Sequence, residues 1–264
     1  MELLADPDVK VRTLRCSGGP SERPYAVVGD DVYELCLVRD GCFHARGPDH
    51  VDVLADPSTC LLGGPGHVVE VTHPCSGGDV DTLVQVSRPV LASIAGDSLD
   101  LPATAQTSGE LAQLHMRLLA SARRSLEPAA LEECAIHLFA TAIEQSEPAR
   151  VAAGEPAKRR QQQIVDDARS ALMTNLDLSV VQLARIVGCS PHHLSRLFVR
   201  QTGAGVARYR LMVRVQRALD AMVGGETDLS AIAADCGFAD QAHLTRAVKA
   251  FTGASPSGLR AAVL

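Results

Sequence analysis

Aromatic side chains are scarce in this 264-residue chain: they make up 3% of it, and Trp is absent. Any core must therefore rely on Leu, Val, Ile and Ala. No apolar run reaches the ~18 residues that a membrane-spanning helix needs. The N-terminal stretch MELLADPDVK lacks the basic and then apolar pattern of a secretory signal. We therefore expect a cytoplasmic protein with no membrane partner.

Common catalytic motifs are also missing. The chain has no P-loop, no Gly-x-Ser-x-Gly nucleophile elbow and no His-Glu-x-x-His zinc motif. We therefore expect a protein that is not an enzyme and has no catalytic residues.

Positive charge is short overall, since the net charge is −6, but it is unevenly distributed. Residues 156–264 contain 14 Lys/Arg against 8 Asp/Glu, whereas residues 1–155 contain 11 against 23. A basic segment attracts phosphate and an acidic segment repels it. Any nucleic-acid-binding surface is therefore expected in the C-terminal part.

The stretch from Leu178 to Gly203 predicts two short helices joined by a tight turn. Ser179 is a suitable N-cap for the first helix, and Gly188 suits the turn because it tolerates positive φ. Ser190 and Pro191 begin the second helix. One face of that helix is apolar and the rest is polar and basic, which is what a helix that reads the major groove requires.

The same pattern recurs from Leu229 to Gly253. His193-Leu194-Ser195-Arg196 corresponds to His243-Leu244-Thr245-Arg246, with an offset of 49 before the turn and 50 after it, so the second turn is one residue longer. The amphipathic segment Val206–Val223 lies between the copies and, as a helix, would be about 27 Å long. Such a rod could hold two reading helices near one turn of B-DNA apart, ~34 Å.

The polar faces of the two second helices supply the candidate DNA contacts. Arg can bond bidentately to guanine, Gln can read adenine, and Thr can offer its methyl or hydroxyl group. The expected base-contacting residues are His192, Ser195, Arg196, Gln241, Thr245 and Arg246. The expected phosphate-contacting residues are Arg200 and Lys249. The alternative is that some of them are only solvated or reach only phosphate.

These two motifs (about 179–202 and 230–252), the linking segment, the Gly237-Phe238 turn and the closing phrase Thr252–Arg260 resemble the DNA-binding domain of the AraC/XylS family of bacterial transcriptional regulators. The resemblance covers Gln161 to Ala262. It implies a homodimer that binds promoter or operator DNA and can contact RNA polymerase. Family members usually have Tyr or Phe where Leu259 stands, a departure that does not touch the DNA face.

Short apolar runs alternate with turn signals from Tyr25 to Ser87, which indicates a small β-barrel or sandwich. Asp40-Gly41 predicts a two-residue hairpin turn, and residues 1–24 predict an irregular arm or edge strand. The candidate strands are 25–28, 32–39, 42–46, 51–55, 59–62, 68–73 and 82–86. Beside the C-terminal resemblance, this part is similar to the cupin-like effector domain of the same family, including the turn at 64–67.

Leucine-rich stripes within residues 107–145 predict a helical hairpin, with Pro128 beginning its second helix. The resemblance implies that such helices pair two subunits; the alternative is that they only cover the barrel. We therefore expect an α+β protein. Residues 1–150 would form a cupin-like sensory and dimerisation domain, 151–160 a linker, and 161–264 the DNA-binding domain, whose first helix is Gln161–Thr174.

Eight cysteines in a cytoplasmic protein do not imply disulfides, and those at 134, 189 and 236 are assigned to helix packing. Cys42-x-His44 and His73-x-Cys75 are i,i+2 pairs, which share a face on a strand. Two such pairs could form a Cys2His2 site for zinc or another soft metal. No Cys-x2-Cys spacing is present and Pro74 interrupts one pair, so the alternative is scattered core cysteines around an unknown organic ligand, or no ligand.

The expected function is that of a sequence-specific transcriptional regulator whose N-terminal domain senses a small molecule or a metal. Two alternatives stay open: a metal- or thiol-reactive sensor built on the N-terminal Cys/His set, and a cupin-like metalloenzyme with an accessory DNA-binding domain.

Overall fold

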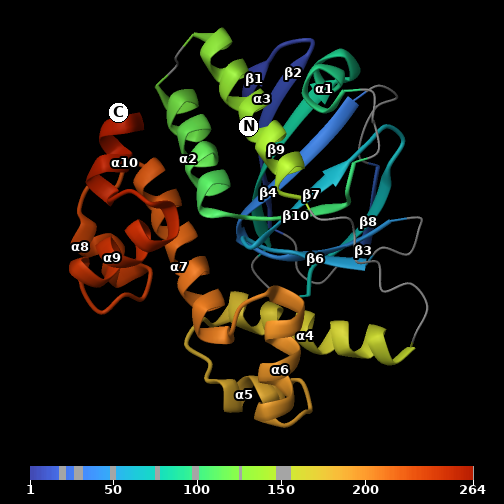
Figure 1. Cartoon of the computed structure of the whole chain (residues 1–264), viewed down its shortest axis with the longest axis vertical. Coiled ribbons are helices and arrows are strands. Elements are labelled where there is room, and N and C mark those ends of the chain that lie inside the picture. Colours follow the sequence, from blue (N-terminus) through green and yellow to red (C-terminus); the bar gives the residue numbers. More distant parts are fainter. Residues whose placement is uncertain are drawn as a thin grey trace.

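The computed structural model describes residues 1–17, 22–26, 32–47, 52–74, 78–96, 101–124, 127–146 and 156–263. Within these ranges, two antiparallel sheets and three helices form the N-terminal part, and the C-terminal part is helical (Figure 1). The predicted α+β fold class is confirmed.

A six-stranded sheet has the order β1-β2-β9-β4-β7-β10. Its strands are β1 (Glu2–Ala5), β2 (Val9–Cys16), β9 (Asp79–Ser87), β4 (Val32–Gly41), β7 (Thr59–Gly63) and β10 (Thr104–Gln106). Side chains of β9 alternate between the two faces of this sheet. Val84 and Val86 belong to the cluster that contains the helices, whereas Leu83 lies in the smaller cluster with the second sheet.

The second sheet has four strands in the order β3-β8-β5-β6. They are β3 (Glu22–Ala26), β8 (Val68–Thr72), β5 (Phe43–Arg46) and β6 (Asp52–Ala55). Cys36 and Val38 of β4 pack with Phe43 and Ala45 of β5 between the two sheets. The expected small β-barrel or sandwich is thus present as two sheets that share an apolar interior.

The prediction of a two-residue hairpin turn at Asp40-Gly41 is wrong. β4 continues through both residues, which pair with Val80 and Asp79 of β9, and β5 belongs to the other sheet. Gly41 has φ +79°, and a Cβ there would lie 2.2 Å from the carbonyl oxygen of Gly78. Long-range pairing with β9 overrides the local turn signal, and Gly41 instead lets the chain pass from one sheet to the other.

The first 16 residues, part of the expected irregular arm or edge strand at 1–24, are more regular than expected. β1 is an edge strand, but β2 lies inside the sheet, where it pairs with β9 over its whole length. Val9 and Val11 alternate with exposed or half-buried residues and are fully buried. Helix α1 (Arg88–Ala95) and strand β10 were not expected from the sequence; residues 27–31, which include the end of the expected first strand, lie outside the described residues.

The predicted helical hairpin is confirmed as α2 (Gly109–Arg123) and α3 (Pro128–Glu144), with Pro128 as the first residue of α3. Leu111 and Leu118 of α2 and Phe139 of α3 pack on the six-stranded sheet. The hairpin therefore covers the sheet, as one of the two interpretations of the sequence held.

Helix α2 has a second apolar face that the sequence did not reveal. Ala112, Met116 and Leu119 pack into the core of the C-terminal helices. The backbone of α2 lies very close to the backbone of the C-terminal helices at Gly109, where a Cβ would lie 1.8 Å from the carbonyl oxygen of Phe251. Helix α2 is thus shared by the two parts of the chain.

Seven helices make up the C-terminal part. They are α4 (Pro156–Thr174), α5 (Val180–Ile186), α6 (Pro191–Thr202), α7 (Val206–Val223), α8 (Leu229–Asp235), α9 (Gln241–Thr252) and α10 (Pro256–Val263). Helix α4 begins at Pro156 and not at Gln161, inside the expected linker, because Pro is suited to the first position of a helix. Helix α7 has the predicted bounds. No helix among the described residues is long and apolar enough to cross a membrane.

Candidate nucleic-acid interface

Helices α5 and α6 form the first predicted helix-turn-helix. Ser179 caps α5 in a reciprocal capping box with Gln182. Gly188 takes φ +67° in the turn, and Ser190 caps α6 by accepting a 3.2 Å hydrogen bond from the amide of His193. Each local signal in the sequence therefore produces the expected element.

Helices α8 and α9 repeat this geometry. Gly237 takes φ +75°, and Asp240 caps α9 by accepting from the amide of His243 at 2.6 Å. The amide of Phe238 donates to Ala233 at 2.8 Å, as the amide of Cys189 donates to Ala184 at 2.9 Å. The turn of the second copy is one residue longer, as predicted, since α8 ends at Asp235 and α9 begins at Gln241.

The ends of the two second helices match in detail. Both α6 and α9 have 12 residues and finish on a left-handed glycine. The Thr202 hydroxyl donates to Phe198 at 2.8 Å, and the Thr252 hydroxyl donates to Val248 at 2.8 Å. The two copies are therefore one structural unit used twice.

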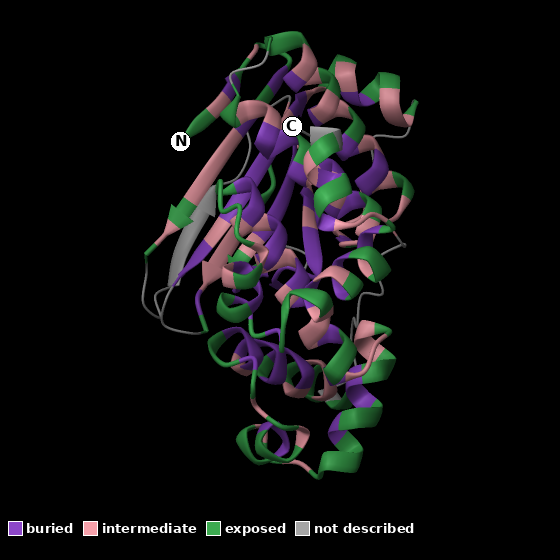
Figure 2. Cartoon of the chain, turned by 90° about the vertical axis from the view of Figure 1, so that its left-hand side faces the viewer, coloured by how far each residue is buried: buried purple, intermediate pink, exposed green. Residues whose placement is uncertain are grey.

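Each second helix buries one face and leaves the other to solvent (Figure 2). Leu194 and Phe198 of α6 are fully buried, as are Leu244 and Val248 of α9. All but one of the candidate contact residues are exposed: His192, Ser195, Arg196, Arg200, Gln241, Arg246 and Lys249; Thr245 is half-buried. The predicted contact face is thus accessible in both copies.

The equivalent arginines Arg196 and Arg246 make no ion pair or hydrogen bond with any residue that the structure describes. Other candidates already have partners within the chain. The Ser195 hydroxyl donates to Pro191 at 2.9 Å, Gln241 accepts from Ser230 at 3.3 Å, and Arg200 donates to Gln161. The two arginine guanidinium groups are therefore available to a nucleic acid, as are the side chains of His192 and Lys249, which are exposed and also make no such contact with the described residues.

Helix α7 separates the two copies, with α5 and α6 near its start and α8 and α9 near its end (Figure 1). Its Tyr209 and Val213 belong to the core of the first copy, and its Leu219 and Met222 to the core of the second. Packing at both ends fixes each unit on the rod, so the two contact faces do not move independently of α7.

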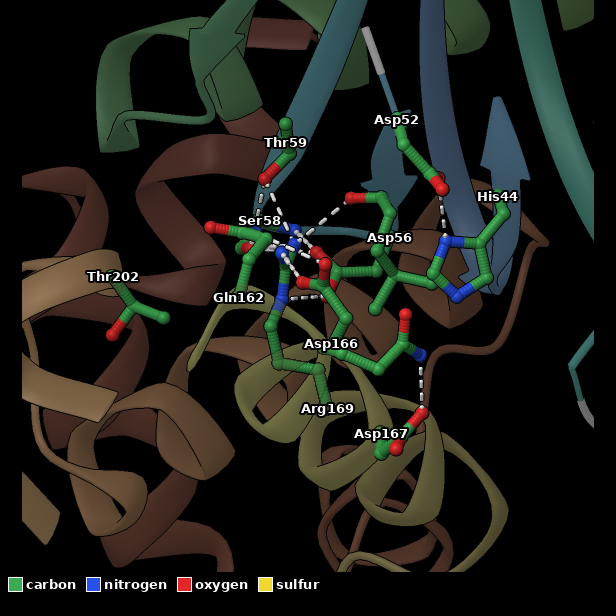
Figure 3. Close-up of polar contacts among 12 residues, drawn as sticks. His44, Asp52, Asp56, Ser58, Thr59, Gln162, Asp166, Asp167, Arg169 and Thr202 are labelled. Carbon is green, nitrogen blue, oxygen red and sulfur yellow. Dashed lines mark hydrogen bonds and ion pairs between the residues drawn. The ribbon is translucent and has the colours of Figure 1, made fainter. Parts of the chain in front are cut away.

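A buried polar network joins the C-terminal helices to the N-terminal domain (Figure 3). Nε of Arg169 on α4 donates to Asp56, in the turn between β6 and β7, at 2.8 Å. Nη2 of the same guanidinium donates to the Thr59 hydroxyl at 3.0 Å and to the Leu54 carbonyl at 3.2 Å. The Tyr209 hydroxyl of α7 also donates to Asp56.

Electrostatics hold this network in its ionised form. Burial disfavours a charged Asp56, but the charge and hydrogen bonds of Arg169, with the hydrogen bonds of Ser58 and Tyr209, lower the pKa of Asp56 below its usual value. This contact was not predicted from the sequence. The available signal was a charged residue at 169, next to the apolar positions Ala168 and Leu172, but the sequence does not show its partner 113 residues away.

The four predicted metal ligands are not gathered in one place among the described residues. Cys42 is fully buried in the cluster with α4. The ring of His44 lies 3.2 Å from Asp52, and it is the main cause that lowers the pKa of Asp52 to about 2. His73 lies 2.6 Å from Asp79 instead, and Cys75 is outside the described residues. The Cys2His2 set stays a prediction.

The three cysteines assigned to helix packing all contact apolar cores, but Cys189 and Cys236 lie in the turns after α5 and α8, and Cys134 and Cys189 are only partly buried. Cys236 is buried in the core of the second copy, Cys189 packs against the core of the first, and Cys134 packs against the helical hairpin.

These features define a domain of the helix-turn-helix class. Residues 183–262 match the family described as "Helix-turn-helix domain". The arabinose operon regulatory protein of Escherichia coli K12 is 32% identical over 89 residues, which cover 34% of this chain and 30% of that protein. The arabinose operon regulatory protein of Salmonella typhimurium LT2 is 34% identical over 82 residues, which cover 31% of this chain and 29% of that protein. The matched region is thus under a third of these relatives' length.

Solved structures align over more of the chain but less closely. Fatty-acid-bound ToxT from Vibrio cholerae is 11% identical with a TM-score of 0.39, over 96% of this chain and 94% of that chain. The AraC-like transcriptional activator CuxR is 19% identical with a TM-score of 0.42, over 83% of this chain and 79% of that chain. Over the C-terminal segment, the sequence matches agree with the AraC-type resemblance, and residues 183–262 form a helix-turn-helix domain.

Proposed function

We propose that this protein is a sequence-specific transcriptional regulator, with a C-terminal domain that reads two segments of one DNA duplex and an N-terminal domain that senses a signal. One observation carries the proposal: the duplicated unit exposes Arg196 and Arg246 at equivalent positions on helices of equal length. The proposal gives the chain a binding role and not a catalytic one.

Charge supports the same assignment. The region that contains the duplicated unit is the basic part of an acidic chain. The N-terminal domain carries the excess of Asp and Glu, so it would be repelled by phosphate. An acidic protein can bind DNA when its cations are gathered on one face, and affinity should then fall steeply with added salt.

Selection from a pool of random DNA duplexes tests the proposal and identifies the operator sequence in the same experiment. The full chain should enrich a site with two halves about 10 base pairs apart. Arg196→Ala should weaken binding by about 1–3 kcal/mol and relax the preference at a base in one half only; Arg246→Ala should do the same in the other half.

Arg88→Ala is the matched control, because Arg88 is an exposed arginine at the start of α1 in the N-terminal domain. It should leave both affinity and preference unchanged. Failure to enrich any sequence, or equal losses for all three variants, would contradict the proposal.

Sensing would act through the contacts between the two domains. Nε of Arg39 on β4 donates to Asp220 of α7 at 2.7 Å, and Nε of Arg217 of α7 donates to Asp40 at 2.8 Å. These ion pairs are partly exposed, so hydrogen bonds to water could replace them. A ligand that prefers one arrangement of the domains would then shift the orientation or freedom of α7.

Homodimerisation, a contact with RNA polymerase and cytoplasmic residence belong to the same proposal and rest on the family resemblance. The second apolar face of α2 is already covered by the C-terminal helices. Pairing of two subunits through that face would therefore require the DNA-binding domain to move away first.

A further inference from the structure

A cluster of metal-binding side chains lies in the N-terminal domain, where β2 ends and β9 begins. Cys16 is the last residue of β2 and is opposite Asp79, the first residue of β9. His73 directly follows β8. The Cys16 sulfur, a ring nitrogen of His73 and a carboxylate oxygen of Asp79 all lie within 4.8 Å of one another, and no other group of this kind occurs among the described residues.

Buried polar atoms in this cluster lack partners. Nε2 of His73 lies 2.6 Å from Oδ1 of Asp79, but the two are not aligned as a hydrogen bond. Nδ1 of His73 and Oδ1 of Asp81 have no hydrogen-bond partner among the described residues. The side chains of His73, Asp79 and Asp81 are each more than nine-tenths buried. An unsatisfied buried polar group is destabilising, so the arrangement is better suited to a bound ligand than to an empty interior.

The cluster is also short of positive charge. Asp79 and Asp81 lie on the same face of β9 because they are two residues apart. A divalent cation bound beside them would offset the negative charge of both carboxylates.

We propose that Cys16, His73 and Asp79 bind one divalent transition-metal ion, with zinc(II) as the ion of best fit. Thiolate, imidazole and carboxylate are the ligand types of zinc sites. A sulfur and a nitrogen ligand disfavour magnesium and calcium, which prefer oxygen ligands. Three protein ligands leave a fourth position open. Of the Cys2His2 set predicted from the sequence, only His73 belongs to this site.

Cobalt(II) is the probe of choice, because a thiolate ligand gives it a near-ultraviolet charge-transfer band. The purified full chain, stripped with a chelator, should bind one cobalt per chain and show this band. Cys16→Ser should abolish the band. His73→Ala and Asp79→Asn should each weaken binding by more than the roughly 10–100-fold that the loss of a supporting outer-shell group costs.

Three variants serve as controls or discriminators. Cys134→Ser removes a half-buried thiol on α3 and His44→Asn removes the partner of Asp52; neither should alter the cobalt spectrum. No cobalt band in the unaltered chain, or a band that survives Cys16→Ser and is lost in Cys75→Ser, would overturn the proposal. The second result would favour the Cys2His2 set instead.

Thermal unfolding provides a readout for any variant that folds poorly. Zinc(II) should raise the unfolding midpoint of the unaltered chain in a concentration-dependent way, because only the folded state holds all three ligands together. Asp79→Asn should remove most of that rise; an undiminished rise would count against the site. These measurements do not involve DNA, so their outcome is independent of the test of the proposed function.

Discussion

Arg169 and Asp56 form a buried ion pair, 2.8 Å from Nε to Oδ2, that joins two parts of the chain 113 residues apart. The Asp56 side chain is completely buried and that of Arg169 is 8% exposed. Both charges lie in a network that supplies further hydrogen bonds from Ser58 and Tyr209. Removal of one partner should therefore cost much more than loss of a surface pair.

Asp56→Ala is the first prediction. It removes the nearer of the two carboxylates that face the buried Arg169 guanidinium and leaves only Asp166, at 3.3 Å; breaking a buried pair typically costs about 3–5 kcal/mol. We expect a lower urea midpoint at pH 7, by about that free energy. Asp177→Ala is the control, because Asp177 pairs with Arg214 at 2.5 Å but is 81% exposed, and such pairs contribute at most about 1 kcal/mol. Equal effects of the two substitutions would show that the buried network does not hold the domains together.

Acid should weaken the same contact. The pKa of Asp56 is lower in the folded state than the roughly 3.9 of an unfolded chain. Its contribution is therefore complete above about pH 4 and is lost as the pH falls through the folded-state pKa. We expect the difference in unfolding midpoint between the unaltered chain and Asp56→Asn to be largest near neutral pH and to shrink below about pH 4. A difference that stays constant from pH 7 to pH 3 would contradict this.

Gly109→Ala tests the close contact between α2 and α9. The new Cβ would lie 1.8 Å from the Phe251 carbonyl oxygen, a backbone atom that cannot rotate away. We expect a loss of about 1–3 kcal/mol, as for other overpacked sites, or separation of the two helices. Thermal unfolding measures the loss.

Gly205→Ala is the matched control for that substitution. Gly205 has φ −74°, and a Cβ there would meet nothing within 4 Å. Gly205 is the N-cap of α7, where Ala is less favourable than Gly, so the loss should stay below about 1 kcal/mol. A Gly109→Ala protein that is as stable as this control would mean that α2 and α9 are not in close contact.

The C-terminal helix-turn-helix domain was predictable because its signals are local. Ser179, Ser190 and Gly188 each act within a few residues of their place in the chain, and the repeat doubled the evidence. The accessible face of α6 followed as well, because the buried stripe with Leu194 and Phe198 fixes which side remains exposed.

The N-terminal domain was less predictable, because pairing between strands far apart in the sequence decides where each strand ends and which strands are neighbours. The Asp40-Gly41 signal indicates a hairpin when read locally, but β9 pairs with both residues and carries β4 past them. The sequence did not group Cys16 with the candidate metal ligands, because nothing in the sequence places β2 beside β9.

By itself, the sequence determined the class of this protein: a duplicated helix-turn-helix on a linking helix, preceded by a β-rich acidic domain. Only the tertiary structure decided that α2 serves both domains, that Arg169 finds Asp56, and that Cys16, His73 and Asp79 converge. The reason is physical. Caps and helical periodicity are set by neighbours along the chain, whereas buried charges and ligand clusters are set by which strands and helices pack together.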